Sequence, residues 1–316
     1  MKIILYMALV LSLVACQKDE ADQEENQSEE IVEFREDTEL RENTSDEVET
    51  EPILKDFTYI RDTSILKARV NTLIDDWGLN ESQVGLVYHN LDDGDRLDFN
   101  SDKVFLAGST SKVPIVMYLF DKANEGLISL DQVLYVGEHQ MEDGTGVIYY
   151  ESGPGAAYSL YELAQLMIEY SDNTATNMIY GYLGSIDGSY LLDTLAWKYD
   201  ISSTEGNYIT PAEAARIVER IYLNEVENPL YDDLVGFMKD SIYKDYFTPN
   251  VKGMVYNKTG DFDGFFNDIG IVEGEDSTYI FSAYTEALYD PIGFLNELGA
   301  LVDDWHNGPD ESDRIK

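Results

Sequence analysis

The first helix-like apolar pattern after the N-terminal segment runs from Thr63 to Trp77. Its large side chains recur every three or four residues, at Ile65, Leu66, Val70, Leu73, Ile74 and Trp77. That period predicts an amphipathic helix with one face on a core. The next apolar-rich segments, Gln83 to His89 and Arg96 to Phe99, flank Asp93-Gly94, a dipeptide typical of hairpin turns. The pattern therefore predicts a helix followed by a β-hairpin.

A nearly continuous apolar run, Val113 to Phe120, follows the small residues Ala107-Gly108 and stops before Gly126. This arrangement is typical of a loop that leads into a buried helix. The middle of the chain is expected to be mostly helical. Further helices are predicted at Leu160 to Tyr170 and at Pro211 to Leu223.

Strand patterns return in the last quarter of the chain, at Gly253 to Asn257, Asp268 to Val272 and Thr278 to Tyr284. Asp290-Pro291 then opens a final helix with an apolar stripe at Ile292, Leu295, Leu298, Val302 and Trp305. Strands with helices at both chain ends, split by a helical insertion, predict an α/β (α+β) fold. We expect an antiparallel sheet flanked by the terminal helices, an all-α lobe beside it, and the functional cleft between the two.

The N-terminal segment has a different character. One lysine and an apolar stretch from Ile3 to Val14 precede Cys16, and the segment is short for a membrane span. It resembles a bacterial lipoprotein signal, which implies cleavage before Cys16 and a lipid on that residue. We interpret residues 1–15 as a signal peptide, 16–56 as a disordered acidic tether, 57–307 as the folded domain and 308–316 as a tail.

Composition excludes several functions. The formal net charge is −41, and residues 17–54 alone hold 16 acidic and 3 basic residues. Much of the acidity therefore belongs to the folded domain, which makes nucleic acid an improbable partner and a saline habitat a hypothesis. Cys16 is the only cysteine and no H-x-x-x-H occurs, so we expect no disulfide, no metal site and no cofactor.

Three short strings carry the chemical signal: Ser109-Thr110-Ser111-Lys112, Ser171-Asp172-Asn173 and Lys258-Thr259-Gly260. S-x-x-K alone is weak, because Ser64 to Lys67 and Ser241 to Lys244 share its spelling. The copy at Ser109 is distinguished by its place at the start of the predicted buried helix, where free N–H groups favour a developing oxyanion. The order of the three strings predicts a serine enzyme that uses lysine to move protons.

With these strings the chain resembles the class A β-lactamase-like serine hydrolases, the penicillin-recognising SxxK/SDN/KTG superfamily. Context such as Asn173-Thr174-Ala175-Thr176-Asn177 and Asn267-Asp268-Ile269-Gly270 extends the likeness over about Thr63 to Trp305. The resemblance implies a nucleophilic Ser109, Lys112 as its general base, and Ser171 as the proton relay to the leaving nitrogen. We expect burial and the neighbouring Lys258 to make Lys112 partly neutral.

The resemblance also implies a set of substrate-binding residues. Asn173 would hold the side-chain amide of the substrate, Lys258 and Thr259 its carboxylate, and the N–H groups of Ser109 and Asp261 the oxyanion. The binding residues so predicted are Asn173, Lys258, Thr259, Gly260 and Asp261.

The sequence departs from the family at the step that releases the acyl group. The E-x-x-L-N string of class A enzymes is absent, and the interval before Thr210 holds one glutamate, Glu205. Glu205 is either a substitute water activator or an exposed loop carboxylate. Asp261 also brings a negative charge to the expected carboxylate pocket, with no arginine between Arg220 and Arg314 to offset it.

Three related functions stay open: a β-lactamase of the class A type, a D-alanyl-D-alanine peptidase acting on peptidoglycan, and a surface receptor that is acylated without turnover. A Ser-His-Asp hydrolase finds no support, because G-x-S-x-G is absent and His89, His139 and His306 fall in a predicted strand, a loop and the terminal tail. We expect a monomer anchored through Cys16 to a membrane on the extracytoplasmic face, with β-lactams or peptidoglycan stem peptides as small-molecule substrates.

Overall fold

The computed structural model describes residues 62–187, 191–201 and 207–308. The predicted signal peptide, the tether, Cys16 and Glu205 lie outside the described residues. Within the described part of the chain, no helix is both long and apolar enough to cross a membrane.

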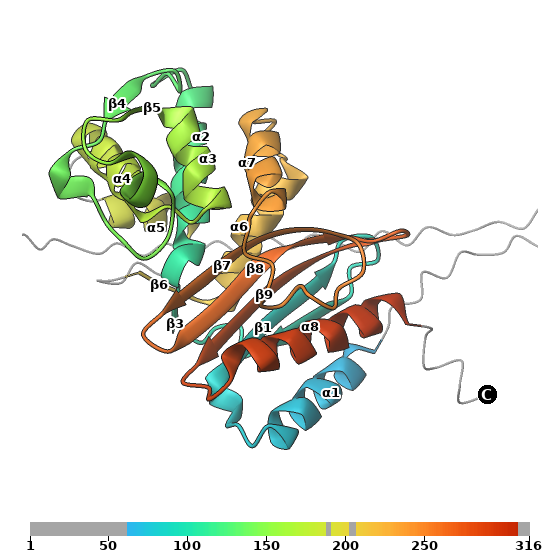
Figure 1. Cartoon of the computed structure of the whole chain (residues 1–316). Coiled ribbons are helices and arrows are strands. Elements are labelled where there is room, and N and C mark those ends of the chain that lie inside the picture. Colours follow the sequence, from blue (N-terminus) through green and yellow to red (C-terminus); the bar gives the residue numbers. More distant parts are fainter. Residues whose placement is uncertain (1–61, 188–190, 202–206, 309–316) are drawn as a thin grey trace, which may run out of the picture. The chain divides into compact units, whose positions relative to one another are not determined.

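A five-stranded antiparallel sheet forms the centre of the folded part, in the order β2-β1-β9-β8-β7 (Figure 1). Its strands are β1 (Val84–Asn90), β2 (Arg96–Phe99), β7 (Met254–Phe262), β8 (Phe265–Glu273) and β9 (Thr278–Glu286). The hairpin predicted across Asp93-Gly94 pairs β1 with β2. Strand β7 lies at one edge, so one of its sides is not covered by a neighbouring strand of this sheet.

The two terminal helices, α1 (Thr63–Asp76) and α8 (Pro291–Asn307), pack together on one face of the sheet (Figure 1). Successive strand residues point to opposite faces, so Tyr88 contributes to the core under these helices and Val87 to the core on the other side. Most of the apolar residues that predicted the two helices are buried there, whereas Ile292, at the start of the predicted α8 stripe, is exposed. Leu298 of α8 is fully buried.

The other face carries the helical lobe, built from α2 (Lys112–Asn124), α3 (Leu160–Glu169), α4 (Asn173–Asp187), α5 (Leu191–Tyr199), α6 (Pro211–Leu223) and α7 (Leu230–Lys239). Two short strand pairs accompany it, β3 (Phe105–Leu106) with β6 (Tyr208–Ile209), and β4 (Val133–Tyr135) with β5 (Ala157–Ser159). Helix α6 begins as its sequence predicts, because Thr210 caps it through a hydrogen bond from Glu213 N and Pro211 takes the first position.

The structure confirms the predicted fold and corrects the bounds or type of several elements. The strand predicted to end at Asn257 is too short, because β7 pairs with β8 as far as Phe262. The placement of His306 in a tail is wrong, since it is a buried residue of α8 whose imidazole contacts the Tyr88 and Ser277 hydroxyls at 2.9 and 2.8 Å. The β4–β5 pair lies in a stretch expected to be helical.

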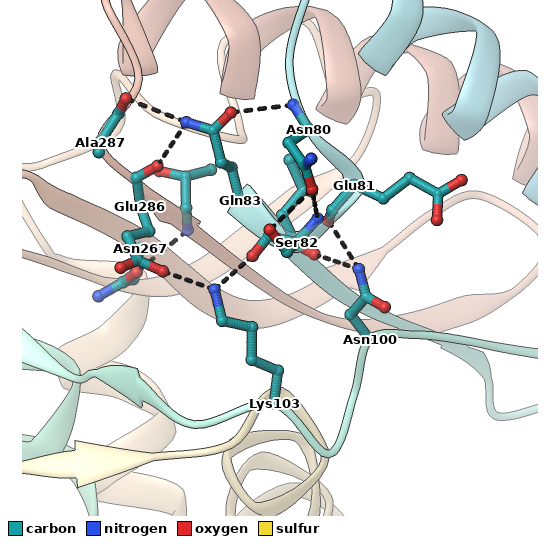
Figure 2. A network of polar contacts seen from close by, with 11 residues as sticks. Asn80, Glu81, Ser82, Gln83, Asn100, Lys103, Asn267, Glu286 and Ala287 are labelled. Atoms are coloured by element: carbon teal, nitrogen blue, oxygen red, sulfur yellow. Dashed lines mark hydrogen bonds and ion pairs between the residues drawn. The ribbon is translucent and has the colours of Figure 1, made fainter.

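A polar network fixes the segment that leads to Ser109 (Figure 2). The Lys103 ammonium donates to a Glu286 carboxylate oxygen at 2.5 Å and to the Ser82 carbonyl. Asn100 Nδ2 donates to the carbonyls of Glu81 and Val84 at 2.7 and 2.9 Å. These bonds attach the chain between β2 and β3 to the ends of β1 and β9, and so position the start of the next turn.

Candidate active site

A cleft of about 770 Å³ is lined by Ser109, Lys112 and Asn173 of the first two strings and by Asp261, which directly follows the third. Ser109 lies in a single 3-10 turn, Gly108–Ser111 (η2), that runs directly into α2. Ser171 lies in the loop between α3 and α4, and Lys258 on the edge strand β7. The tertiary fold therefore joins residues that are far apart in the chain.

Two glycines allow the Ser109 turn to press against β7. A Cβ on Gly260 would lie 2.7 Å from Ser109 N and 2.6 Å from Thr110 N. Gly108 has φ +56°, and a Cβ there would lie 2.9 Å from Asp261 N. Only glycine permits this approach. The backbone nitrogens of Ser109 and Asp261 consequently lie at the same corner of the cleft, as an oxyanion site requires.

Side chains from the sheet hold the same turn in place. Asn267 Nδ2 donates to the carbonyls of Leu106 and Ala107 at 2.9 and 3.1 Å. Thr110 Oγ1 donates to Ala107 O and lies 2.8 Å from the Tyr284 hydroxyl. Because Asn267 and Tyr284 are fully buried, Ser109 sits on a rigid support. The Asn-Asp-Ile-Gly string was the signal for Asn267, although the sequence did not reveal this role.

Lys112 is 4% exposed and turns its ammonium to the Ser171 loop. Its Nζ donates to Ser171 O at 2.5 Å, to Ser171 Oγ at 3.2 Å and to Asn173 Oδ1 at 2.8 Å. Burial lowers the pKa of Lys112 to about 7. The negative charges of Asp172, Glu142 and Asp261 oppose this effect, because each raises the pKa. The lysine can thus exist in its neutral form near neutral pH because it is buried, which is one of the two causes predicted from the sequence.

Ser171 joins the two lysines. Its Oγ accepts hydrogen bonds from Lys112 Nζ at 3.2 Å and from Lys258 Nζ at 3.0 Å. Its backbone has a positive φ of 54°. A left-handed conformation at a non-glycine residue is a strained geometry that is often found at functional sites. With both lone pairs of the oxygen engaged, its own proton can be donated to a group in the cleft.

Lys258 is fully buried, and its Nζ also donates to Thr259 O at 2.8 Å. Burial and the positive charge of Lys112 lower its pKa well below the ordinary lysine value. Asp261, an exposed residue beside it, raises the pKa of both lysines.

The middle residue of the S-D-N string has a structural task that the sequence did not reveal. Asp172 accepts hydrogen bonds from Val147 N, Ile148 N and Ala175 N at 2.7, 2.9 and 2.8 Å. Gly146, with φ +107°, lies so close that a Cβ would meet the Asp172 carboxyl carbon at 2.3 Å. The buried carboxylate thereby joins the 142–150 segment to the start of α4.

That segment contributes further residues to the cleft. Thr145 Oγ1 donates to Ser171 O at 2.6 Å, and Asn173 Nδ2 donates to Asp143 O at 2.8 Å. Glu142 lines the cleft and accepts a hydrogen bond from Asn177 Nδ2 at 2.7 Å. No motif signalled Thr145 or Glu142. Among the described residues, no group of three or more His, Cys, Asp or Glu side chains is arranged to hold a metal ion.

The other two S-x-x-K strings lie elsewhere. Ser64 is an exposed residue in the first turn of α1, where Asp62 caps the helix. Ser241 and Lys244 follow α7, and Lys244 is held beneath β7 rather than in the cleft. Only the string at Ser109 therefore meets the other two motifs.

Residues 63–305 match the beta-lactamase enzyme family. The chain belongs to this family. A β-lactamase of Rhodobacter capsulatus is 27% identical to it over 161 residues, an alignment that covers 47% of this chain and 54% of that protein. The chain thus spans about half the length of this curated relative.

Solved structures show the same fold. PBP-A is 25% identical, with a TM-score of 0.70 over 77% of this chain and 97% of that chain. A β-lactamase from Sphaerobacter thermophilus is 20% identical, with a TM-score of 0.66 over 78% of this chain and 98% of that chain. At such identities the beta-lactamase family fold is shared, while the substrate is not thereby assigned.

Proposed function

We propose that this protein is a serine hydrolase that forms an acyl-enzyme at Ser109 with β-lactams or related amides. The observation that carries the proposal is the pair of buried lysines on Ser171 Oγ, Lys112 at 3.2 Å and Lys258 at 3.0 Å. One lysine near neutrality supplies a base, and the hydroxyl between the two supplies a path for the proton.

The steps follow from this arrangement. Neutral Lys112 takes the proton of Ser109 as its oxygen attacks the amide carbonyl, whose oxygen is received by the N–H groups of Ser109 and Asp261. As the C–N bond breaks, Ser171 gives its proton to the leaving nitrogen and is reprotonated by Lys112. Asn173 would hold the substrate's side-chain amide, and Lys258 with Thr259 its carboxylate. The product is an ester at Ser109.

The comparisons support this chemistry for the fold. A mutant of PBP-A, 24% identical to this chain with a TM-score of 0.70, is described as an acyl-enzyme complex with penicillin-G. The release of such an ester needs an activated water. Glu205, which is either a substitute water activator or an exposed loop carboxylate, lies outside the described residues. Substrate and turnover therefore decide among hydrolase, peptidase and receptor.

The experiment is covalent labelling with a fluorescent penicillin. We expect wild type and Ser64→Ala to be labelled and Ser109→Ala to be unlabelled, since Ser64 is the matched serine of another S-x-x-K string. Absence of label in folded wild type, or equal label in Ser109→Ala, would overturn the proposal.

Intact mass and turnover then separate the three functions. Sustained nitrocefin hydrolysis supports a β-lactamase. Cleavage of a D-alanyl-D-alanine peptide supports a peptidase, and a single stoichiometric burst supports a receptor.

We also propose lipid attachment at Cys16, anchoring a monomer on the extracytoplasmic face of a membrane. The motif around Cys16 supports it. Recovery of Cys16→Ser in the soluble fraction, with wild type in the membrane fraction, is the expected result. Equal distribution of both proteins would contradict the anchor.

A further inference from the structure

The walls of the active-site cleft carry negative charges that the acylation steps do not use. Glu142 lines the cleft on the side of the helical lobe, and Asp261 and Asp263 line it at the end of β7. Within the described part of the chain, Lys112 is the only basic residue in this lining, and the proposed mechanism needs it neutral. Three carboxylates are therefore opposed by at most one ammonium.

Lys258, the residue assigned to a substrate carboxylate, does not change this balance at the walls. It is fully buried on Ser171 Oγ and is not among the residues that line the cleft. None of the carboxylates of Glu142, Asp261 and Asp263 forms an ion pair with a lysine or an arginine of the described residues. The outer groups of a substrate therefore meet negative charge.

The backbone that carries two of these carboxylates is held in a defined position. Glu142 N donates to Thr174 Oγ1 at 3.0 Å, and its carboxylate accepts from Asn177 Nδ2 at 2.7 Å. Asp263 and Gly264 form the two-residue turn between β7 and β8, with φ values of 49° and 83° that suit a tight hairpin. Both carboxylates belong to exposed residues, so a ligand can reach them without unfolding the wall.

Exposed aromatic rings accompany the carboxylates on both walls. Phe262 is 65% exposed and Tyr208 is 41% exposed, and both line the cleft. On the wall that carries Glu142, the hydroxyl of exposed Tyr150 accepts from Gly144 N, a residue of the lining, at 3.1 Å. Open aromatic faces attract ammonium groups through their π electrons, and neighbouring carboxylates add to that attraction. The walls thus combine the two kinds of group that bind an ammonium.

We propose that Glu142 and Asp263, with the rings of Phe262 and Tyr150, select substrates that carry an ammonium group on the acyl side of the reacting amide. This inference rests on the proposed function, because the reacting amide is the one that Ser109 attacks. A substrate with a carboxylate in the same place would meet like charge and bind more weakly. The substrate class is therefore a β-lactam or a peptide amide with an amine on its acyl side. The selecting residues take no part in proton transfer.

The test uses three penicillins that differ at one carbon of the side chain. Benzylpenicillin carries hydrogen there, ampicillin an amine and carbenicillin a carboxylate, while the reacting ring and its own carboxylate are the same. At about pH 6.5 the amine is mostly protonated. At this pH and low salt, the second-order rate constant of acylation should be about fivefold higher for ampicillin than for benzylpenicillin, and about fivefold lower for carbenicillin. Added salt should bring the three rates together.

Two substitutions remove charge and keep shape. Asp263→Asn suits the positive φ of the turn, and Glu142→Gln keeps an oxygen for Asn177. Each should lower the ratio of the ampicillin rate to the benzylpenicillin rate about twofold, and the double variant should bring it near one. Changes in Lys112 cancel in this ratio, because they act on every substrate alike. The matched control is Asp76→Asn, which removes an exposed carboxylate of α1 and should keep the wild-type ratio.

Binding to the Ser109→Ala protein reads the selectivity without acylation. In equilibrium dialysis, ampicillin should bind most tightly and carbenicillin most weakly. If wild type is never acylated but this order appears, the proposed function fails and the selectivity stands. If wild type is acylated by the three penicillins at equal rates, or if the double variant keeps the wild-type ratio, the selectivity is refuted and the proposed function stands.

Discussion

The sharpest prediction concerns the protonation of Lys112. Its pKa of about 7 means that the neutral form is about a tenth of the population at pH 6 and about nine tenths at pH 8. Only the neutral amine can accept the Ser109 proton. Acylation should therefore rise about tenfold between these pH values, since the penicillin carboxylate stays ionised throughout. Lys112→Arg keeps the charge but cannot lose it, and should slow acylation by about 100-fold or more.

The assay is stopped-flow acylation by a fluorescent penicillin from pH 5.5 to 8, with thermal unfolding of each variant as the control for folding. Glu142→Gln offers a finer check, because the Glu142 carboxylate is one of the charges that raise the pKa of Lys112. Its removal should move the acidic limb to lower pH. A flat profile across pH 7, or acylation of the Lys112→Arg protein as fast as that of wild type, would refute the assignment of Lys112 as the base.

Three further substitutions test the architecture around the site. Gly260→Ala places a carbon 2.7 Å from Ser109 N, so we expect acylation about 100-fold slower in the same stopped-flow assay. A rate within about twofold of wild type would contradict the oxyanion site proposed at Ser109 N and Asp261 N. Asp172→Ala leaves three backbone N–H groups without their acceptor, so the free energy of unfolding measured in urea should fall by about 3 kcal/mol. A loss below about 1 kcal/mol would contradict the structural role of the Asp172 carboxylate. Leu298 lies in the core between the sheet and the terminal helices, so Leu298→Ala should lower the free energy of unfolding by about 3 kcal/mol and leave the labelling rate of the folded protein unchanged. Slower labelling would show that the two faces of the sheet are coupled.

The fold could be predicted in outline because its signals are local. The stripe of α8 and the Asp93-Gly94 turn each follow from spacing within a few residues. The end of β7 could not be read in this way. Its exposed end, Asp261 and Phe262, becomes a strand because Phe265 and Phe266 of β8 pair with it. Pairing between strands is a property of two segments, so neither segment shows it alone.

The sequence pointed to the motif residues that lie together at the candidate site, and it missed the residues that support them. Ser109 and Ser171 belong to strings whose spelling reflects a reaction. Asp172, Asn267 and Thr145 act through bonds to backbone atoms of distant segments. Such bonds produce no recognisable spacing of residues in the sequence, because they depend on how distant segments meet in the fold.

The sequence by itself determined the candidate nucleophile Ser109, its two companion motifs, and the order of most helices and strands. Only the tertiary structure decided which charged groups lie together: it sets Lys112 and Lys258 on one hydroxyl, and it joins Lys244 to the buried Asp268 through Asn257. In the sequence, Lys244 belongs to an S-x-x-K string that lies outside the candidate site. In the structure, its ammonium donates a hydrogen bond to the side chain of Asn257, next to Lys258 in β7. The physical reason is that the protonation of a buried group depends on the charges and dipoles around it, which folding alone brings together.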